Sequence, residues 1–159
     1  MRLLGKALPA QSTGRTPRND NHAMPGLLLI AHAPLASALK AVAEHTYPSC
    51  FAQLSVLDVQ TSLCPEDVET AARALMVAAG HEEWLVLTDV PGATPHNGAL
   101  RLLDTQGRVR LVSGLNGPML WRSLCYGSMP VAQLAERAAE GGHRGIEIFI
   151  HPEHRPESS

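Results

Sequence analysis

The sequence predicts an α/β protein built on a doubly wound parallel sheet. Two uninterrupted aliphatic runs, Leu27–Ile30 and Leu85–Leu87, each end close to a single polar side chain, His32 and Asp89 respectively. Runs without polar alternation are typical of strands buried on both faces, as in parallel sheets. Segments with helical spacing of apolar residues alternate with the strands, and this order favours helices on both faces of one sheet.

In the first half of the chain, two strand and helix pairs are expected. The run ending at His32 is followed by a helix over 37–46, which Pro48 ends, and then by a strand over 51–59. A second helix opens at Pro65, with two acidic residues in its first turn, and runs to Ala79. Gly80 supplies the stop signal.

The second half repeats this arrangement, with glycines predicted to interrupt it near its end. Gly141, Gly142 and Gly145 are expected to break the chain. The expected elements are strands over 83–90, 108–113 and 146–150 and helices over 97–103, 116–126 and 131–139.

Composition limits the classes of function. A chain of 159 residues (17.0 kDa) fits one domain. Its net charge of −2 gives no electrostatic case for binding nucleic acid or an anionic membrane surface, and no run reaches the roughly 20 apolar residues of a membrane span. The cysteines, Cys50, Cys64 and Cys125, form no CxxC pair, which argues against disulfides and thiolate metal sites and favours a reducing, cytoplasmic compartment.

The ends of the chain are expected to lie outside the domain, which we place at 24–151. Residues 1–10 faintly resemble a secretory signal, but Lys6 and Pro9 interrupt the apolar stretch. Residues 11–23 are polar and read as disordered, and 152–159 as a loose polar tail. Because Met24 directly precedes the first strand, we expect translation to begin there; a flexible regulatory arm over 1–23 is the alternative.

Strand order decides which polar side chains meet. Right-handed crossovers leave two common orders for such a sheet. In the flavodoxin-like order 2-1-3-4, the first and third strands are neighbours at the switch point, where ligands bind. This order brings His32 and Asp89 together although they are remote in the sequence.

A histidine beside a carboxylate suits two kinds of chemistry. The carboxylate fixes the ring tautomer and stabilises the imidazolium that develops, so the ring serves as a general base or as a phosphoryl acceptor. A base needs a nucleophile to activate, and no activated Ser or Cys is evident. A hydrolase that uses His32 as its base is therefore the third and least favoured function. Phosphoryl transfer fits better, because Thr88, Gly92 and Thr94 offer hydroxyl and backbone groups for phosphate near a helix start.

The remaining polar residues receive structural interpretations. His96 is expected to be an exposed turn residue, with a place in the site as the alternative, and Asn97 to begin or cap its helix. No cofactor or metal is expected, since the other histidines lack the spacing of zinc ligands. These are His22, His45, His81, His143, His151 and His154.

Three segments resemble the mannose-type EIIA domain of the bacterial sugar phosphotransferase system (PTS). They are IAHAPLASAL (30–39), LTDVPGATPHN (87–97) and VSGLNGPML (112–120), and the resemblance extends over 24–150. It implies that His32 is phosphorylated by the phosphocarrier HPr and passes the group to an EIIB partner. It further implies that Asp89 hydrogen-bonds the ring, that Thr94 is the hydroxyl of the following loop, and that strand 146–150 is exchanged across a homodimer.

The sequence departs from the family pattern around the site. Ala33 stands where a glycine usually follows the histidine, and Gly92-Ala93, preceded by Pro91, replaces a glycine pair. These changes reduce backbone freedom and bear on the choice of partner. No EIIB sequence follows 150, so we expect a separate acceptor chain and contact with a membrane only through a PTS permease.

Several roles remain open within this resemblance. The same histidine would serve sugar uptake and PTS-linked regulation, so the sequence does not separate the two. A phosphoryl donor for a dihydroxyacetone kinase and a non-catalytic binding module of the same fold are the alternatives.

Overall fold

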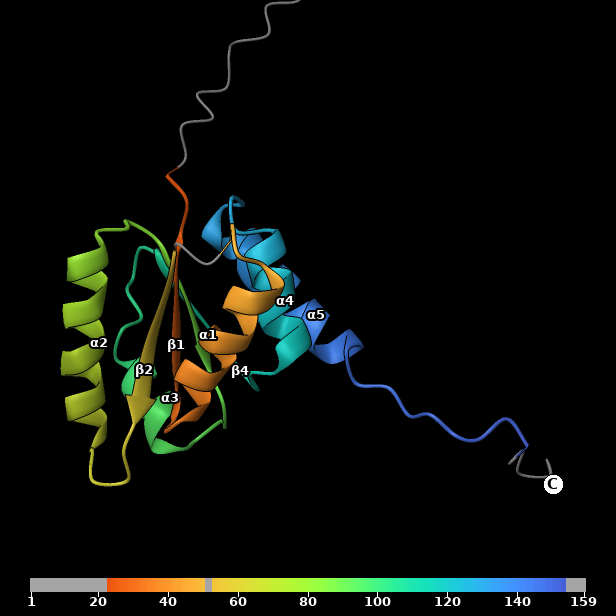
Figure 1. The fold of residues 1–159 in the computed structure, drawn as a ribbon. Helices are drawn as coiled ribbons and strands as arrows, with labels where there is room; N and C mark the ends of the chain where they lie inside the picture. The colour runs from red at the N-terminus through yellow and green to blue at the C-terminus, as the bar shows by residue number, and fades with distance from the viewer. Residues whose placement is uncertain (1–22, 51–52, 154–159) are drawn as a thin grey trace, which may run out of the picture.

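Four parallel strands form the centre of the structure, a computed structural model that describes residues 23–50 and 53–153 (Figure 1). Helices cover both faces of this sheet. In chain order the elements are β1 (Gly26–His32), α1 (Leu35–Thr46), β2 (Leu54–Val59), α2 (Pro65–Ala79), β3 (Trp84–Thr88), α3 (Thr94–Leu100), β4 (Val109–Ser113), α4 (Gly117–Cys125) and α5 (Val131–Arg144).

The strand order is β2-β1-β3-β4, which confirms the predicted order 2-1-3-4. All three pairings are parallel. In the pairing of β1 with β3, Ile30 lies opposite Thr88, so the residues that follow each strand emerge side by side. The carboxyl ends of the two central strands therefore meet at one edge of the sheet.

The aliphatic runs are buried on both faces of the sheet, which explains their lack of alternation. From Gly26 to Ala31, every residue of β1 is buried. Leu27 and Leu29 face the layer of α1, α4 and α5, whereas Leu28 and Ile30 face α2 and α3 (Figure 1). Each fully buried leucine or isoleucine side chain contributes about 1.5–3 kcal/mol by leaving water.

Most predicted elements are present, with shifted ends. Helix α2 spans the predicted residues and ends at Gly80, whose left-handed φ of 75° suits glycine. Helix α1 begins at Leu35 and α3 at Thr94, both earlier than predicted. Strand β2 begins at Leu54, and residues 51 and 52 of the predicted strand lie outside the described residues.

The predicted end of the last helix is wrong. Helix α5 continues through Gly141 and Gly142 to Arg144 instead of ending at residue 139. The two glycines face α4 rather than breaking the chain. A Cβ atom at Gly141 would lie 2.6 Å from Cβ of Arg122, and one at Gly142 would lie 2.8 Å from Cε of Met119. Glycine is therefore needed here for close helix packing, which outweighs its low helix propensity.

Residues 146–150 form no strand within the single chain. They lead away from the body of the molecule after α5 (Figure 1). Their apolar side chains are exposed, with Ile148 at 92% and Phe149 at 85%. Among the described residues β4 pairs only with β3, which leaves the other edge of β4 open.

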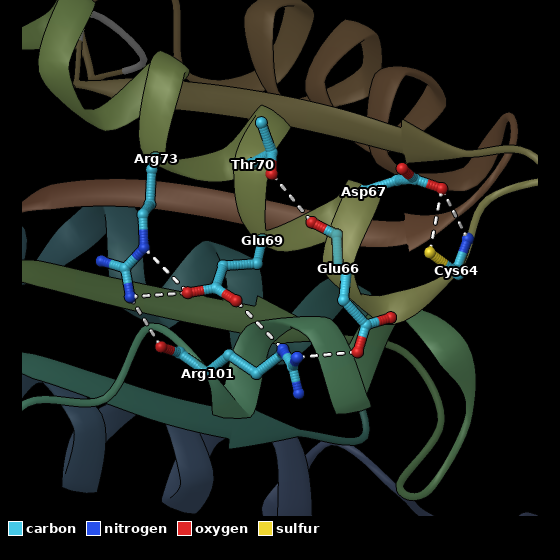
Figure 2. A network of polar contacts seen from close by, with 7 residues as sticks. All are labelled: Cys64, Glu66, Asp67, Glu69, Thr70, Arg73 and Arg101. Atoms are coloured by element: carbon cyan, nitrogen blue, oxygen red, sulfur yellow. Dashed lines mark hydrogen bonds and ion pairs between the residues drawn. The ribbon is translucent and has the colours of Figure 1, made fainter.

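Ion pairs fix α3 against α2 (Figure 2). Arg101, directly after α3, donates to Glu66 at 2.7 Å and to Glu69 at 3.0 Å. Arg73 donates to Glu69 and also to the backbone carbonyl of Arg101, at 2.8 Å. Because these side chains are partly exposed, solvent screens each pair and its contribution to stability is small. Together they hold the helix that follows the Asp89 loop.

Candidate functional site

His32 and Asp89 meet where β1 and β3 end. His32 is the last residue of β1, and Asp89 directly follows β3. The ring Nδ1 of His32 lies 2.6 Å from Oδ2 of Asp89, and the backbone N–H of His32 donates to the same oxygen at 2.9 Å. The other carboxylate oxygen, Oδ1, accepts from the backbone N–H of Val90 at 2.9 Å. The structure thus brings together the two residues that the strand order placed side by side.

The carboxylate determines which ring nitrogen is free. Burial raises the pKa of the Asp89 carboxyl, but the hydrogen bonds from the backbone and ring of His32 and from Val90 outweigh this effect, so its pKa lies below the usual range. The carboxylate is therefore ionised at neutral pH and accepts a hydrogen bond from Nδ1–H of the His32 ring. That tautomer leaves the lone pair on Nε2.

Exposure differs between the two partners. The Asp89 side chain is only 7% exposed, whereas the His32 side chain is 49% exposed. The acid is thus fixed inside the protein while the ring lies at the surface. No described residue hydrogen-bonds Nε2, so this nitrogen is accessible as a nucleophile.

The loop between Asp89 and α3, together with the first residue of that helix, contains two of the predicted phosphate-binding residues, Gly92 and Thr94. Gly92 adopts a left-handed φ of 83°, which favours glycine, and its carbonyl accepts from Nδ2 of Asn97 at 3.0 Å. Thr94 is half-buried and begins α3. Asn97 lies within α3, where it fixes the loop, and the capping position belongs to Ala93, so its predicted role as a cap is wrong.

Thr88, the third predicted phosphate-binding residue, lies beneath this loop. Its side chain is fully buried, and its hydroxyl donates to Oγ of Ser113 at 3.0 Å. The same hydroxyl lies 3.3 Å from Nδ1 of His96, which is half-buried rather than an exposed turn residue. These three side chains form a polar layer that joins β3, β4 and α3 directly behind Asp89.

Two supporting residues carry weak signals in the sequence. Asp58, near the end of β2, accepts from the backbone N–H of Ser37 at 3.1 Å in the first turn of α1. An acid near the carboxyl end of a predicted strand is the only sign of this role. Ser113 has a similar position at the end of β4, and no pattern indicates that its partner is Thr88.

Two further kinds of site are relevant in the described residues, a cluster of metal ligands and a membrane-spanning helix. No three His, Cys, Asp or Glu side chains within 23–50 and 53–153 are grouped as metal ligands. None of the helices in this part of the chain has the length and apolarity of a membrane span.

Solved structures of PTS components share this fold. The mannose/sorbose-specific IIA subunit from Enterococcus faecalis matches with a TM-score of 0.74 and 24% identity, covering 84% of this chain and 100% of that one. Component EIIA from Streptococcus agalactiae matches with a TM-score of 0.70 and 25% identity, covering 79% and 98%. The PTS IIA protein associated with the fucose utilization operon of Streptococcus pneumoniae matches with a TM-score of 0.65 and 22% identity, covering 79% and 93%.

The family assignment rests on the sequence itself. A search of curated proteins finds no match. The family model EIIA-man, described as the PTS system fructose IIA component, matches residues 26–138, which include both His32 and Asp89. The chain therefore belongs to the EIIA-man family of phosphotransferase-system IIA components.

Proposed function

We propose that this protein is a phosphoryl carrier that accepts a phosphoryl group from phospho-HPr on Nε2 of His32 and passes it to an EIIB-type acceptor. The observation that carries the proposal is the 2.6 Å hydrogen bond between Nδ1 of the half-exposed His32 ring and the ionised Asp89. This bond keeps the proton on Nδ1 and leaves Nε2 as the nucleophile. The family match supplies the class of reaction.

The transfer moves a phosphoryl group (PO₃⁻), and no proton, from the donor histidine to His32. The Nε2 lone pair forms a bond to phosphorus while the bond from phosphorus to the donor's histidine nitrogen breaks, and that electron pair stays on the donor ring. The His32 ring becomes positively charged because Nδ1 keeps its proton, and the charge of Asp89 stabilises it at hydrogen-bond distance. Attack by the acceptor on the same phosphorus reverses these changes.

The phosphoryl oxygens would be held by the loop that follows Asp89. Gly92 lies in this loop and Thr94 begins the helix that follows it, and their backbone N–H groups and the Thr94 hydroxyl are the donors that we assign to the phosphate. Thr88 belongs to the same prediction, but its hydroxyl already donates to Ser113 behind the loop. Of the three predicted phosphate-binding residues, Thr88 is therefore the one whose role most needs a test.

A second copy of the chain would cover the exposed C-terminal segment. Residues 146–150 present four apolar side chains to solvent, and β4 has an open edge. We propose that this segment adds as a strand to β4 of the partner, which would bury those side chains and protect the open edge.

The direct test of the function is phosphorylation by the relay. Wild type, His32→Ala and the control His45→Ala, an exposed histidine on α1, are incubated with phosphoenolpyruvate, enzyme I and HPr and then weighed by intact mass spectrometry. Wild type and His45→Ala should gain one acid-labile phosphoryl group and His32→Ala none. An equal gain in His32→Ala would contradict the assignment, and no gain in the wild type would favour a non-catalytic binding module.

Acceptor specificity separates the remaining roles. Offering the phosphorylated protein to an EIIB protein or to the subunits of a dihydroxyacetone kinase distinguishes the carrier from the kinase donor. We place all of these roles in the cytoplasm, which is consistent with free thiols at Cys50, Cys64 and Cys125.

A further inference from the structure

Cys50 and Cys125 lie at the edge of the sheet opposite to His32. Cys50 follows the end of α1, and Cys125 is the last residue of α4, on the same face of the sheet. Both side chains line one cavity of about 350 Å³, together with Gln53 and Gly127. The fold thus brings together two thiols that are separated by most of the domain in sequence.

Contacts on either side of the cavity fix these two segments relative to each other. The Gln53 side chain donates to the carbonyl of Gly127 at 3.4 Å, and a Cβ atom at Gly127 would lie only 2.6 Å from Nε2 of Gln53. The rings of Tyr47 and Trp121 pack edge to face with centroids 6.1 Å apart. These contacts hold the segments that carry the two cysteines at a fixed position relative to each other.

Both thiols affect the pKa of the Tyr47 hydroxyl. Burial raises the pKa of this hydroxyl, and the neighbouring thiol of Cys125 and then that of Cys50 raise it further. A single phenol thus lies close enough to feel both sulfur atoms. Cys125 is exposed, whereas Cys50 is half-buried and packs against the core beneath the cavity.

We propose that Cys50 and Cys125 form a dithiol that small-molecule disulfides such as glutathione disulfide oxidise to an intramolecular disulfide. The exposed Cys125 thiolate attacks one sulfur of the oxidant and releases one glutathione thiolate. The Cys50 thiolate then attacks the Cys125 sulfur of the mixed disulfide and releases the second glutathione. Two electrons pass from the cysteines to the oxidant, and the two thiol protons end on the two glutathione molecules.

The disulfide would tie the end of α1 to the end of α4 without touching the His32 site. It would close a loop from residue 50 to residue 125, which raises the unfolding midpoint by on the order of 10 °C through restriction of the unfolded chain. The rate of phosphorylation should stay within about twofold of the reduced protein, since Asp89 and its loop lie at the other edge of the sheet. Formation of the disulfide can therefore be tested independently of the proposed phosphoryl transfer.

Cys64 offers the matched control. It lies directly before α2 on the other face of the sheet, and its thiol donates to Oδ2 of Asp67 at 3.0 Å (Figure 2). This hydrogen bond raises the pKa of the Cys64 thiol, which disfavours the reactive thiolate. Serine is a good residue at this helix start, so Cys64→Ser should fold normally.

The experiment treats wild type, Cys64→Ser, Cys50→Ser and Cys125→Ser with glutathione redox buffers. Alkylation of the free thiols, intact mass and peptide mapping then identify the products. Cys64→Ser should lose two hydrogens and both free thiols, whereas Cys50→Ser should accumulate a glutathione adduct on Cys125. Circular dichroism confirms that each variant is folded, and alanine replaces serine where one is not.

Three results would overturn the proposal. They are glutathione adducts on both thiols of Cys64→Ser without an internal disulfide, thiols that stay free in oxidising buffer, and a disulfide that joins two chains or involves Cys64. Failure of phosphorylation in the reduced protein would contradict the proposed function alone and leave this result unaffected.

Discussion

The Asp89 carboxylate accepts three hydrogen bonds, two of them from His32. It accepts the ring N–H and the backbone N–H of His32 on one oxygen and the N–H of Val90 on the other. The same carboxylate therefore fixes the ring tautomer, the end of β1 and the start of the following loop. An amide at this position could accept such bonds on one atom only and would carry no charge.

Asp89→Asn should leave a phosphorylatable histidine that reacts slowly. The amide can present its NH₂ group to Nδ1, which favours the wrong tautomer, and it does not stabilise the positive ring. We expect the rate of phosphorylation by phospho-HPr to fall on the order of 10²-fold, within the usual range for general acid–base assistance. Rapid-quench kinetics measure this rate.

The control is Asp58→Asn, which changes a carboxylate near the end of the neighbouring strand that accepts, among the described residues, from the backbone N–H of Ser37 and not from the His32 ring. Its phosphorylation rate should match wild type. A wild-type rate in Asp89→Asn would mean that the carboxylate does not assist the transfer.

Thr88→Val tests whether the buried hydroxyl supports the site or binds phosphate. Valine keeps the volume but leaves Ser113 and His96 without this partner, so the free energy of unfolding in urea should fall by about 1–2 kcal/mol. Since the side chain is fully buried, the phosphorylation rate of the folded variant should stay close to wild type.

Thr70→Val serves as the control, because the Thr70 hydroxyl only donates to a carbonyl of its own helix. A large loss of phosphorylation with unchanged stability in Thr88→Val would instead assign Thr88 to the phosphate.

At the scale of secondary structure, α2 holds α3, the helix that follows the loop after Asp89. Gly98 of α3 lies against Val68 of α2 so closely that a Cβ atom there would be 2.5 Å from Val68, and Arg101 adds the ion pairs with Glu66 and Glu69. This packing determines where α3 begins and therefore where Thr94 lies relative to His32.

Acid should weaken this arrangement. The pKa values of Glu66, Asp67 and Glu69 are lowered, chiefly by hydrogen bonds from a backbone N–H, the Cys64 side chain and the Arg73 side chain, respectively. A carboxyl with a lower pKa in the folded than in the unfolded chain stabilises the fold above its unfolded value, and this stability is lost as the pH falls through the folded value. The urea concentration at the midpoint of unfolding should therefore decrease as the pH is lowered below about 4.5.

Arg101→Met isolates the share of the α2–α3 network. It keeps most of the apolar stem but removes the charge, so its urea midpoint should depend less steeply on pH than that of wild type over about pH 3 to 5. Parallel curves for the two proteins would show that the ion pairs of Arg101 do not contribute to acid sensitivity.

Local signals in the sequence fix most elements but not the contacts between them. Strands β1 and β3 and their order were predictable because both are buried on two faces and end beside polar residues. Gly141 and Gly142 read as helix breakers, since nothing local indicates that they face Arg122 and Met119. The partnership of Thr88 with Ser113 depends on the register of β3 and β4 and carries no sequence pattern.

At the scale of the whole molecule, the exposed C-terminal segment is the strongest sign of self-association. Ile146, Ile148, Phe149 and Ile150 are each at least 60% exposed in the single chain. Exposed apolar side chains of this kind, in a chain whose described residues leave one edge of β4 unpaired, favour pairing with another chain. The oligomeric state should therefore depend on these residues.

Removing the chain from residue 146 onward should convert a dimer into a monomer, which light scattering measures as a halved mass. The control removes residues 1–23, which should leave the mass of the assembly, the fold and the phosphorylation unchanged. A truncation at 146 that remains dimeric would show that the segment does not bridge two subunits.

If Asp89 holds the proton on Nδ1 of His32, the phosphoryl group must be attached to Nε2, and NMR distinguishes the two ring nitrogens. Protein labelled with ¹⁵N in its histidines is phosphorylated by the relay, and the coupling between ¹⁵N and ³¹P identifies the modified ring nitrogen. We expect a single phosphoryl group on Nε2 of His32, with Nδ1 still protonated beside Asp89. A phosphoryl group on Nδ1 of His32, or on another histidine, would contradict it.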